Sequence, residues 1–259
     1  MRMSLRVLLF ALAWVSCWPP TTAFAQVSKT QQLQGGYAGL TQLGVGVDPS
    51  DIRLDILSQD SRSFSGTLSY IEQDNLIVGG TIAASGKCSI VSEPGDLKSN
   101  LLLNWQTFGG GGAILTGKVL VAKTTGSVVF VRPFNELGVD WAGQVGGRHS
   151  AVVTSSVTRR RSVVPVHIVA GAEGAFRAEF DGWIEPDPAP VVIATSSSDL
   201  RFAAAGVDMS PSQIFTLSGQ VITDLRTGQP TGLNGSYSIQ TPDGKTTDNG
   251  IIAILIGIR

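Results

Sequence analysis

The chain has 259 residues, a formal net charge of −1 at pH 7, 42% hydrophobic residues, only 15% charged residues and 31 glycines. This much hydrophobic content at so low a charge excludes an intrinsically disordered chain, and the near-neutral balance excludes the basic surface of a nucleic-acid-binding protein. The length is sufficient for one or two domains with a substantial core.

Residues 1–25 have the features of a cleaved secretory signal peptide. Arg2 and Arg6 give a positive start, residues 7–15 are apolar, and residues 23–25 (AFA) place small residues where a signal peptidase requires them. The apolar run is too short to span a bilayer. We therefore predict an exported protein that is periplasmic or extracellular.

The two cysteines, Cys17 and Cys88, raise separate questions. A lipidated Cys17 would be the new N-terminus, but Trp14 stands where a lipidation motif has Leu, so the cleaved signal is favoured over this alternative. Cleavage leaves Cys88 as the only cysteine, and no intramolecular disulfide can then form. We predict that Cys88 is a buried small hydrophobic residue, with a bridge to a second chain as the alternative.

Short apolar or alternating runs recur after the predicted signal. Each has the length of a strand, is enriched in β-branched residues and is bounded by turn residues, whereas no stretch of twelve or more shows a helical period. No later stretch predicts a transmembrane helix. The eleven predicted strands are residues 51–57, 64–71, 75–84, 100–105, 113–122, 127–131, 162–170, 176–184, 190–196, 215–222 and 251–258.

A second pattern places Gly midway between two apolar residues, each two positions away. It occurs eight times, where composition alone predicts about three or four occurrences. Because strand side chains alternate, the Gly and both apolar residues share one face, and an inward Gly leaves room for bulky neighbours and lets the strand bend. The eight segments are residues 33–37, 64–68, 78–82, 115–119, 141–145, 180–184, 217–221 and 233–237.

These patterns predict an all-β fold, an antiparallel Gly-rich barrel or sandwich of about ten strands. The loop-like segment 133–150 suggests two lobes, an N-terminal one at 26–131 and a C-terminal one at 132–259; one continuous domain is the alternative. The last run, 250–259, is apolar on both faces, which predicts a central strand.

Residues 112–118 have the spacing G-x-x-x-x-G-K of a phosphate-binding loop. Such a loop requires a Ser or Thr after the Lys and a helix that begins there. Here Val119 follows Lys118, and the next residues are strand-like. We therefore interpret residues 108–113 as a hairpin loop and predict no nucleotide or other cofactor.

Catalytic signals are weak. The chain lacks a G-x-S-x-G elbow, and its two histidines, His149 and His167, have no cluster of further ligands, so no metal site is predicted. Glu179 and Asp181 stand two apart on a predicted strand, near glycosidase spacing, although such carboxylates more often face solvent. No catalytic residue is predicted. Glu179, Asp181 and His149 are the candidates of an alternative hypothesis, an extracellular hydrolase acting on glycan or peptide.

Aromatic residues carry the binding hypothesis. Trp105, Trp141, Trp183 and Tyr237 are the candidate ligand-binding residues, which would line an interior that takes a small apolar ligand. The aromatic pattern by itself favours the other interpretation, in which these rings fill the core opposite the inward glycines. The basic run 159–161 is interpreted as a solvated turn.

The sequence thus favours an exported, non-enzymatic barrel or sandwich that acts as a binding or envelope-surface module, with a small apolar ligand or a surface partner. Besides the hydrolase, one further alternative stays open. The isoleucine-rich run 250–259 would suit a structural subunit that assembles by strand exchange.

Overall fold

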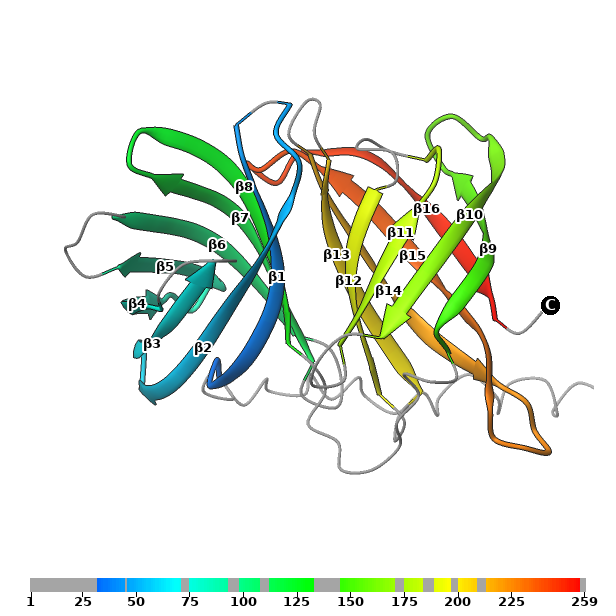
Figure 1. Ribbon diagram of the computed structural model, residues 1–259, viewed down its shortest axis with the longest axis horizontal. Helices are drawn as coiled ribbons and strands as arrows, with labels where there is room; N and C mark the ends of the chain where they lie inside the picture. Colours follow the sequence, from blue (N-terminus) through cyan, green and yellow to red (C-terminus); the bar gives the residue numbers. More distant parts are fainter. Residues whose placement is uncertain are drawn as a thin grey trace, which may run out of the picture. The chain divides into compact units, whose positions relative to one another are not determined.

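The computed structural model describes residues 32–44, 46–70, 75–92, 98–107, 112–132, 145–170, 175–183, 189–196, 200–208 and 213–256. The predicted signal peptide and Cys17 lie outside these residues. In the described part the chain forms sixteen strands, all paired antiparallel, in two closed barrels of eight strands each (Figure 1).

The N-terminal barrel is an up-and-down meander of β1 to β8, in which every strand pairs with its neighbours in sequence. It closes where β1 pairs with β8 as well as with β2. Its strands are β1 (Gly35–Leu43), β2 (Ser50–Asp60), β3 (Ser63–Tyr70), β4 (Leu76–Ile82), β5 (Lys87–Ser92), β6 (Ser99–Thr107), β7 (Ala113–Val121) and β8 (Thr124–Arg132).

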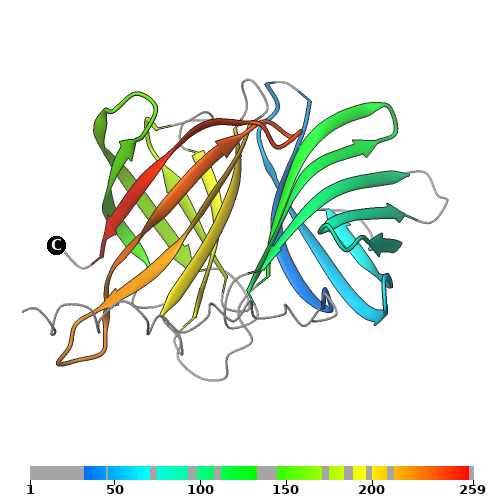
Figure 2. The same cartoon turned by 180° about the vertical axis from the view of Figure 1, so that it is seen from behind.

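The C-terminal barrel repeats this plan with β9 to β16. It closes where β9 pairs with both β10 and β16, and Figure 2 shows the side formed by β14, β15 and β16. Its strands are β9 (Gly147–Ser155), β10 (Arg161–Ala170), β11 (Ala175–Phe180), β12 (Ala189–Ser196), β13 (Arg201–Asp208), β14 (Gln213–Thr223), β15 (Pro230–Gln240) and β16 (Thr246–Leu255).

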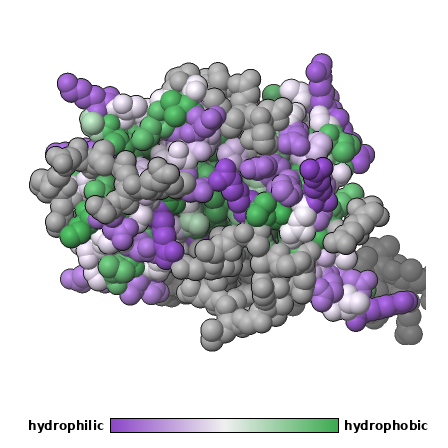
Figure 3. All heavy atoms as spheres, in the orientation of Figure 1, coloured by the Kyte–Doolittle hydropathy of each residue, from purple (hydrophilic) through white to green (hydrophobic). Residues whose placement is uncertain are grey.

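Side-chain alternation builds the interior of each barrel. In β2, Ile52, Leu54 and Ile56 point inward and are at most 3% exposed, while Arg53 and Asp55 point outward and form an ion pair of 2.8 Å. This alternation gives each barrel its own apolar core. On the face shown in Figure 3, hydrophobic and hydrophilic residues are interspersed on the surface.

Some inward glycines make room for rings, Gly80 within the eight Gly segments and Gly206 outside them. At four other segment centres a Cβ would instead lie 2.0–2.2 Å from a carbonyl oxygen of the neighbouring strand, namely at Gly66, Gly117, Gly219 and Gly235. A Cβ on Gly80 in β4 would lie 2.3 Å from the ring of Phe64, and a Cβ on Gly206 in β13 would lie 2.3 Å from the ring of Phe215. Such distances are far below van der Waals contact. The rings of neighbouring strands therefore occupy the space that a side chain would need.

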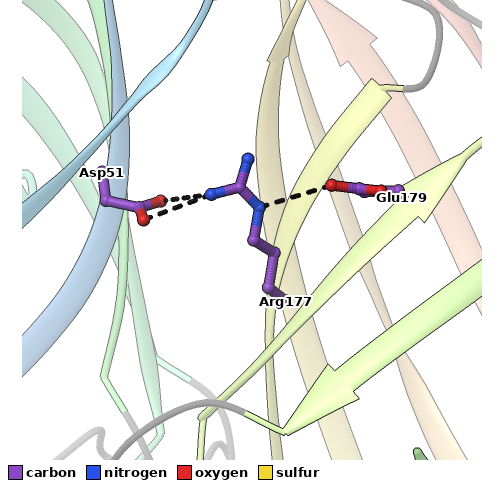
Figure 4. A network of polar contacts seen from close by, with 3 residues as sticks. All are labelled: Asp51, Arg177 and Glu179. Carbon is purple, nitrogen blue, oxygen red and sulfur yellow. Dashed lines mark hydrogen bonds and ion pairs between the residues drawn. The ribbon is translucent and has the colours of Figure 1, made fainter. Parts of the chain in front are cut away.

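The barrels meet at an apolar contact, called the seam below. It is formed by outward-facing residues of β1, β7 and β8 on one side and of β12, β13 and β14 on the other. Two ion pairs join the barrels beside it, Arg177 with Asp51 (Figure 4) and Lys118 with Asp243. The seam consists of Leu40, Ile114, Val129, Val131, Val192, Ala203, Ala205, Val207 and Ile214.

The all-β class and the barrel architecture are confirmed, but the described strands outnumber the predicted ten or so. Each of the eleven predicted runs overlaps a strand, and the five strands without a predicted run are β1, β5, β9, β13 and β15. These five are rich in Gly, Ala and Ser and lack a long β-branched run. Whether the two barrels are separate domains, with a boundary between residues 131 and 132, stays a prediction.

The last strand, β16, is central as predicted, because it pairs with β15 on one side and with β9 on the other. Only one of its apolar faces is buried: Ile252 and Ile254 are 1% exposed, whereas Ile251 is 62% exposed. The described residues include no helix that is long and apolar enough to cross a membrane. Lys118 lies within β7 and faces Asp243, so residues 112–118 do not lead into a helix and form no phosphate-binding loop.

Candidate functional site

Four aromatic rings gather at one end of the C-terminal barrel, and they are called the aromatic cluster below. Trp183 is at its centre, with its ring centroid 5.1 Å from that of Tyr237, 5.2 Å from that of Phe180 and 6.0 Å from that of Phe215. All three contacts are edge-to-face, the arrangement that the ring quadrupoles favour. Phe180, Phe215 and Tyr237 are at most 3% exposed, and Trp183 is partly buried against this core.

Trp183 reaches the cluster from a turn and not from a strand. The predicted strand 176–184 is too long, because β11 ends at Phe180. Gly182 has φ of +67°, a left-handed conformation that Gly adopts without strain, and the chain turns there. The backbone N–H of Asp181 donates to the carbonyl of Pro165 at 3.0 Å, which fixes the start of this turn on β10. Trp183 consequently covers the end of the barrel.

A glycine positions the ring of Tyr237. Tyr237 on β15 is directly opposite Gly250 on β16, and a Cβ on Gly250 would lie 2.8 Å from the tyrosine ring. The phenol therefore lies across the backbone of the neighbouring strand, with its hydroxyl toward the start of β16.

Polar groups surround this hydroxyl. Tyr237 Oη donates to Asp248 Oδ2 at 3.0 Å, and Ser155 Oγ donates to Asp248 Oδ1 at 2.8 Å. The backbone N–H of Asn249 also donates to Asp248 Oδ1 at 2.8 Å, and Ser155 Oγ accepts the N–H of Thr158 at 3.0 Å. The Asp248 carboxylate thus joins β9, β15 and β16 at the end of the barrel where the aromatic cluster lies.

Burial, together with the hydrogen bond to Asp248, raises the pKa of Tyr237 to about 12. The phenol is therefore a neutral donor at physiological pH. The aromatic cluster has an apolar surface of rings, with the neutral hydroxyl of Tyr237 and the carboxylate of Asp248 at its edge. Such an arrangement can bind and orient a small molecule.

Trp105 lies in the other barrel, on β6, where its ring packs against the N-terminal core. Its indole Nε1 is buried and has no hydrogen-bond partner in the described part of the chain. The same barrel contains Cys88, which is buried as predicted, and Tyr37, whose ring lies 5.6 Å from the guanidinium carbon of Arg132.

The structure thus separates the four predicted ligand-binding residues. It brings Trp183 and Tyr237 together, places Trp105 in a different barrel, and leaves Trp141 outside the described residues. Sequence reasoning missed Phe180 and Phe215, although both stand at alternating positions of predicted strands. It also missed Asp248 and Ser155, which only the closure of β16 on β9 brings together.

The three hydrolase candidates form no catalytic group. Glu179 faces outward from β11, with an oxygen 3.8 Å from Arg177 Nε (Figure 4), and Asp181 is exposed in the turn beyond that strand. His149 is on β9 at a position that alternates with outward Arg148, so it faces inward, and its Nε2 lies 2.7 Å from the carbonyl of Val145. Among the described residues, no three His, Cys, Asp or Glu side chains come together as a metal site.

Comparison with known proteins gives little guidance. No family model matches the chain, and no curated protein matches it either. A solved structure of a Nostoc punctiforme protein of unknown function, from the DUF3598 family, is 12% identical with a TM-score of 0.28, covering 88% of this chain and 97% of that one. The Myxococcus xanthus hemagglutinin, solved with a mannopentaose, is 11% identical with a TM-score of 0.19, covering 86% of this chain and all of that one. Scores this low carry no argument about a ligand.

Proposed function

We propose that the chain is an exported, non-enzymatic binding protein whose C-terminal barrel takes a small apolar ligand at the aromatic cluster. The supporting observation is the position of Trp183, which covers the end of the barrel from a turn while Phe180, Phe215 and Tyr237 are buried beneath it. An eight-stranded barrel is just wide enough to be filled by side chains or to hold one small ligand. A ligand that enters at this end displaces the Trp183 indole and packs against the three buried rings.

The polar groups at the edge of the cluster support binding in one orientation. Apolar sites commonly contain a few fixed polar groups that orient their ligand. Tyr237 Oη and Ser155 Oγ are held in place by the Asp248 carboxylate. Because both hydroxyl hydrogens are donated to Asp248, a ligand group that donates one hydrogen bond would meet the oxygen atoms of these hydroxyls at the barrel end.

The assembly alternative has little support from the structure. Strand exchange through the last run requires a free edge. Both barrels are closed, and β16 is paired on each side, so the described strands leave no such edge.

Export is the second part of the proposal and rests on the features of residues 1–25. Intact mass measurement of the protein recovered from the exported fraction of an expressing cell tests it. A chain that begins at Gln26 is the expected product. A product that begins at Cys17 with a lipid mass would establish the lipoprotein alternative.

The binding proposal is tested on a chain that begins at Gln26 and carries Trp105→Phe and Trp141→Phe, so that Trp183 is the only tryptophan. Titration with the neutral probe N-phenyl-1-naphthylamine is expected to change Trp183 fluorescence saturably at one probe per chain.

A matched pair of substitutions locates the site. Phe215→Leu in the aromatic cluster should weaken probe binding by about tenfold, because loss of the phenyl ring removes about 1.4 kcal/mol of contact with the probe. Phe64→Leu, at a buried ring in the other barrel, should leave binding unchanged. Absence of saturable binding, or equal effects of the two substitutions, would refute the proposal in favour of rings that only fill the core.

A further inference from the structure

A basic turn stands at the same end of the C-terminal barrel as the aromatic cluster. Residues 156–160 join β9 to β10, and Arg161 begins β10. Thr158 N–H donates to Ser155 Oγ, Ser155 donates to Asp248, and Asp248 accepts the hydroxyl of Tyr237. A continuous chain of hydrogen bonds therefore links the turn to the cluster.

The turn presents three consecutive arginines to solvent. Arg159, Arg160 and Arg161 are all exposed, and none of them forms an ion pair within the described part of the chain. Arg159 has φ of 57°, a left-handed conformation that costs a non-Gly residue about 1 kcal/mol. Three adjacent like charges also repel one another. The left-handed residue serves the turn of the β9–β10 hairpin, in which the N–H of Ser155 donates to the carbonyl of Arg160 at 3.0 Å. The three adjacent charges have no such role, whereas an anion bound at this turn would be stabilised by the guanidinium groups.

We propose that the ligand of the C-terminal barrel is an amphipathic anion. Its apolar part lies against the aromatic cluster in place of the Trp183 indole, and its carboxylate, phosphate or sulfate group lies outside, at Arg159, Arg160 and Arg161. This inference rests on the proposed function and adds the charge of the ligand to it.

The position of Asp248 explains why the anionic group stays outside. Its carboxylate already accepts hydrogen bonds from Tyr237, Ser155 and Asn249, and it repels a second negative charge from the inner part of the site. Guanidinium groups at the rim bind carboxylate and phosphate oxygens in a forked geometry and tolerate exposure to water. The ligand is therefore oriented with its apolar end inward.

The test compares two probes of equal chain length, dodecanoate and dodecanol, on the chain whose only tryptophan is Trp183. The test variant carries Arg159→Gln, Arg160→Gln and Arg161→Gln. The control variant carries Arg148→Gln, Arg201→Gln and Arg226→Gln, which remove the same charge at exposed positions. These control positions belong to the other end of the same barrel, at the start of β9, at the start of β13 and in the turn between β14 and β15.

The expected result is a rise of about tenfold or more in the Kd of dodecanoate for the test variant, with no change for dodecanol and none in the control variant. Raising the salt concentration to 0.5 M should weaken dodecanoate binding by the unsubstituted chain and leave dodecanol unaffected.

Three other outcomes show whether the anionic ligand alone or the proposed binding function as a whole is wrong. Equal binding of both probes, unchanged in the test variant, would overturn the anionic ligand while leaving the apolar site intact. No binding of either probe would overturn the proposed function itself. Sedimentation with phosphatidylglycerol vesicles, without saturable binding of monomeric dodecanoate, would assign the basic turn to a membrane surface and would also overturn the inference.

Discussion

Arg177 Nη1, on β11 of the C-terminal barrel, lies 3.1 and 3.2 Å from the two carboxylate oxygens of Asp51, on β2 of the N-terminal barrel. The two side chains are 41% and 48% exposed, so water and salt screen their attraction. Leu40, in the adjacent seam, is fully buried between the barrels. Apolar burial in the seam therefore contributes more to holding the barrels together than this ion pair does.

Two substitutions compare these contributions. Asp51→Asn should lower the free energy of unfolding by less than about 1 kcal/mol, as is usual for an exposed pair. Leu40→Ala should lower it by about 2–5 kcal/mol, because it removes buried methyl groups and leaves a cavity. Urea unfolding followed by circular dichroism measures both. A larger loss for Asp51→Asn than for Leu40→Ala would show that the ion pair dominates the contact.

Alkaline pH should destabilise the protein. Burial raises the pKa of Cys88 from 9.0 to about 12, and burial raises the pKa values of Tyr37 and Tyr237 from 10.0 to about 12. In each case the unfolded chain loses its proton first, so the stability that these groups provide is complete below pH 9 and falls between about pH 9 and 12. Each group contributes a slope of about 1.4 kcal/mol per pH unit while only its unfolded form is ionised.

Urea midpoints measured from pH 7 to 11 check this prediction. Tyr237→Phe removes one ionisable group and should reduce the decline above pH 10 relative to the unsubstituted chain. A midpoint that stays constant up to pH 11 would contradict the raised pKa values.

Cys88 should be unreactive in the folded protein. Its side chain is 2% exposed, and its raised pKa leaves almost no thiolate at pH 8. In a chain that begins at Gln26, iodoacetamide should modify Cys88 only after unfolding in urea, as mass spectrometry can measure. Rapid modification of the folded chain, or a disulfide-linked dimer, would contradict this prediction and would favour an intermolecular disulfide through Cys88.

Individual strands were easier to predict from the sequence than the contacts that form only when the barrels close and pack together. Strands such as β2 are visible because they alternate apolar and polar residues, whereas β13 (Arg201–Asp208) has three consecutive alanines and no alternation. The seam buries the outward face of β13 and the core of its own barrel buries the inward face. Its small residues therefore fit a contact between the barrels that no local sequence pattern reveals.

The candidate site was predictable in part for a similar reason. Tyr237 ends one copy of the Gly pattern, at an inward position, whereas Trp183 stands directly after Gly182 in another copy, at a position of the opposite face. Their contact requires a turn at Gly182 and the pairing of β15 with β16, and Asp248 joins them only once β16 closes on β9. Contacts between segments this distant in sequence follow from tertiary closure rather than from local propensity.

Two adjacent glycines of β4 test how tightly the inward positions are packed. A Cβ on Gly80 would lie 2.3 Å from the ring of Phe64 and 2.5 Å from the carbonyl oxygen of Ser89, whereas a Cβ on Gly79 would have its nearest neighbour at 3.9 Å. Gly80→Ala should therefore destabilise the protein by about 1–3 kcal/mol or more, since the ring and the backbone must both move. Gly79→Ala should be neutral or stabilise by about 0.4–1 kcal/mol, because it restricts the unfolded chain without a clash.

Thermal and urea unfolding of the two variants measure the difference, and each variant is the other's control for the loss of a strand glycine. Adding Phe64→Leu to Gly80→Ala should recover only part of the loss, because the Ser89 carbonyl still obstructs the new methyl group. Equal stabilities of Gly79→Ala and Gly80→Ala would show that the barrel wall relaxes around an inward methyl. Gly80 would then have a role other than making room for the ring of Phe64.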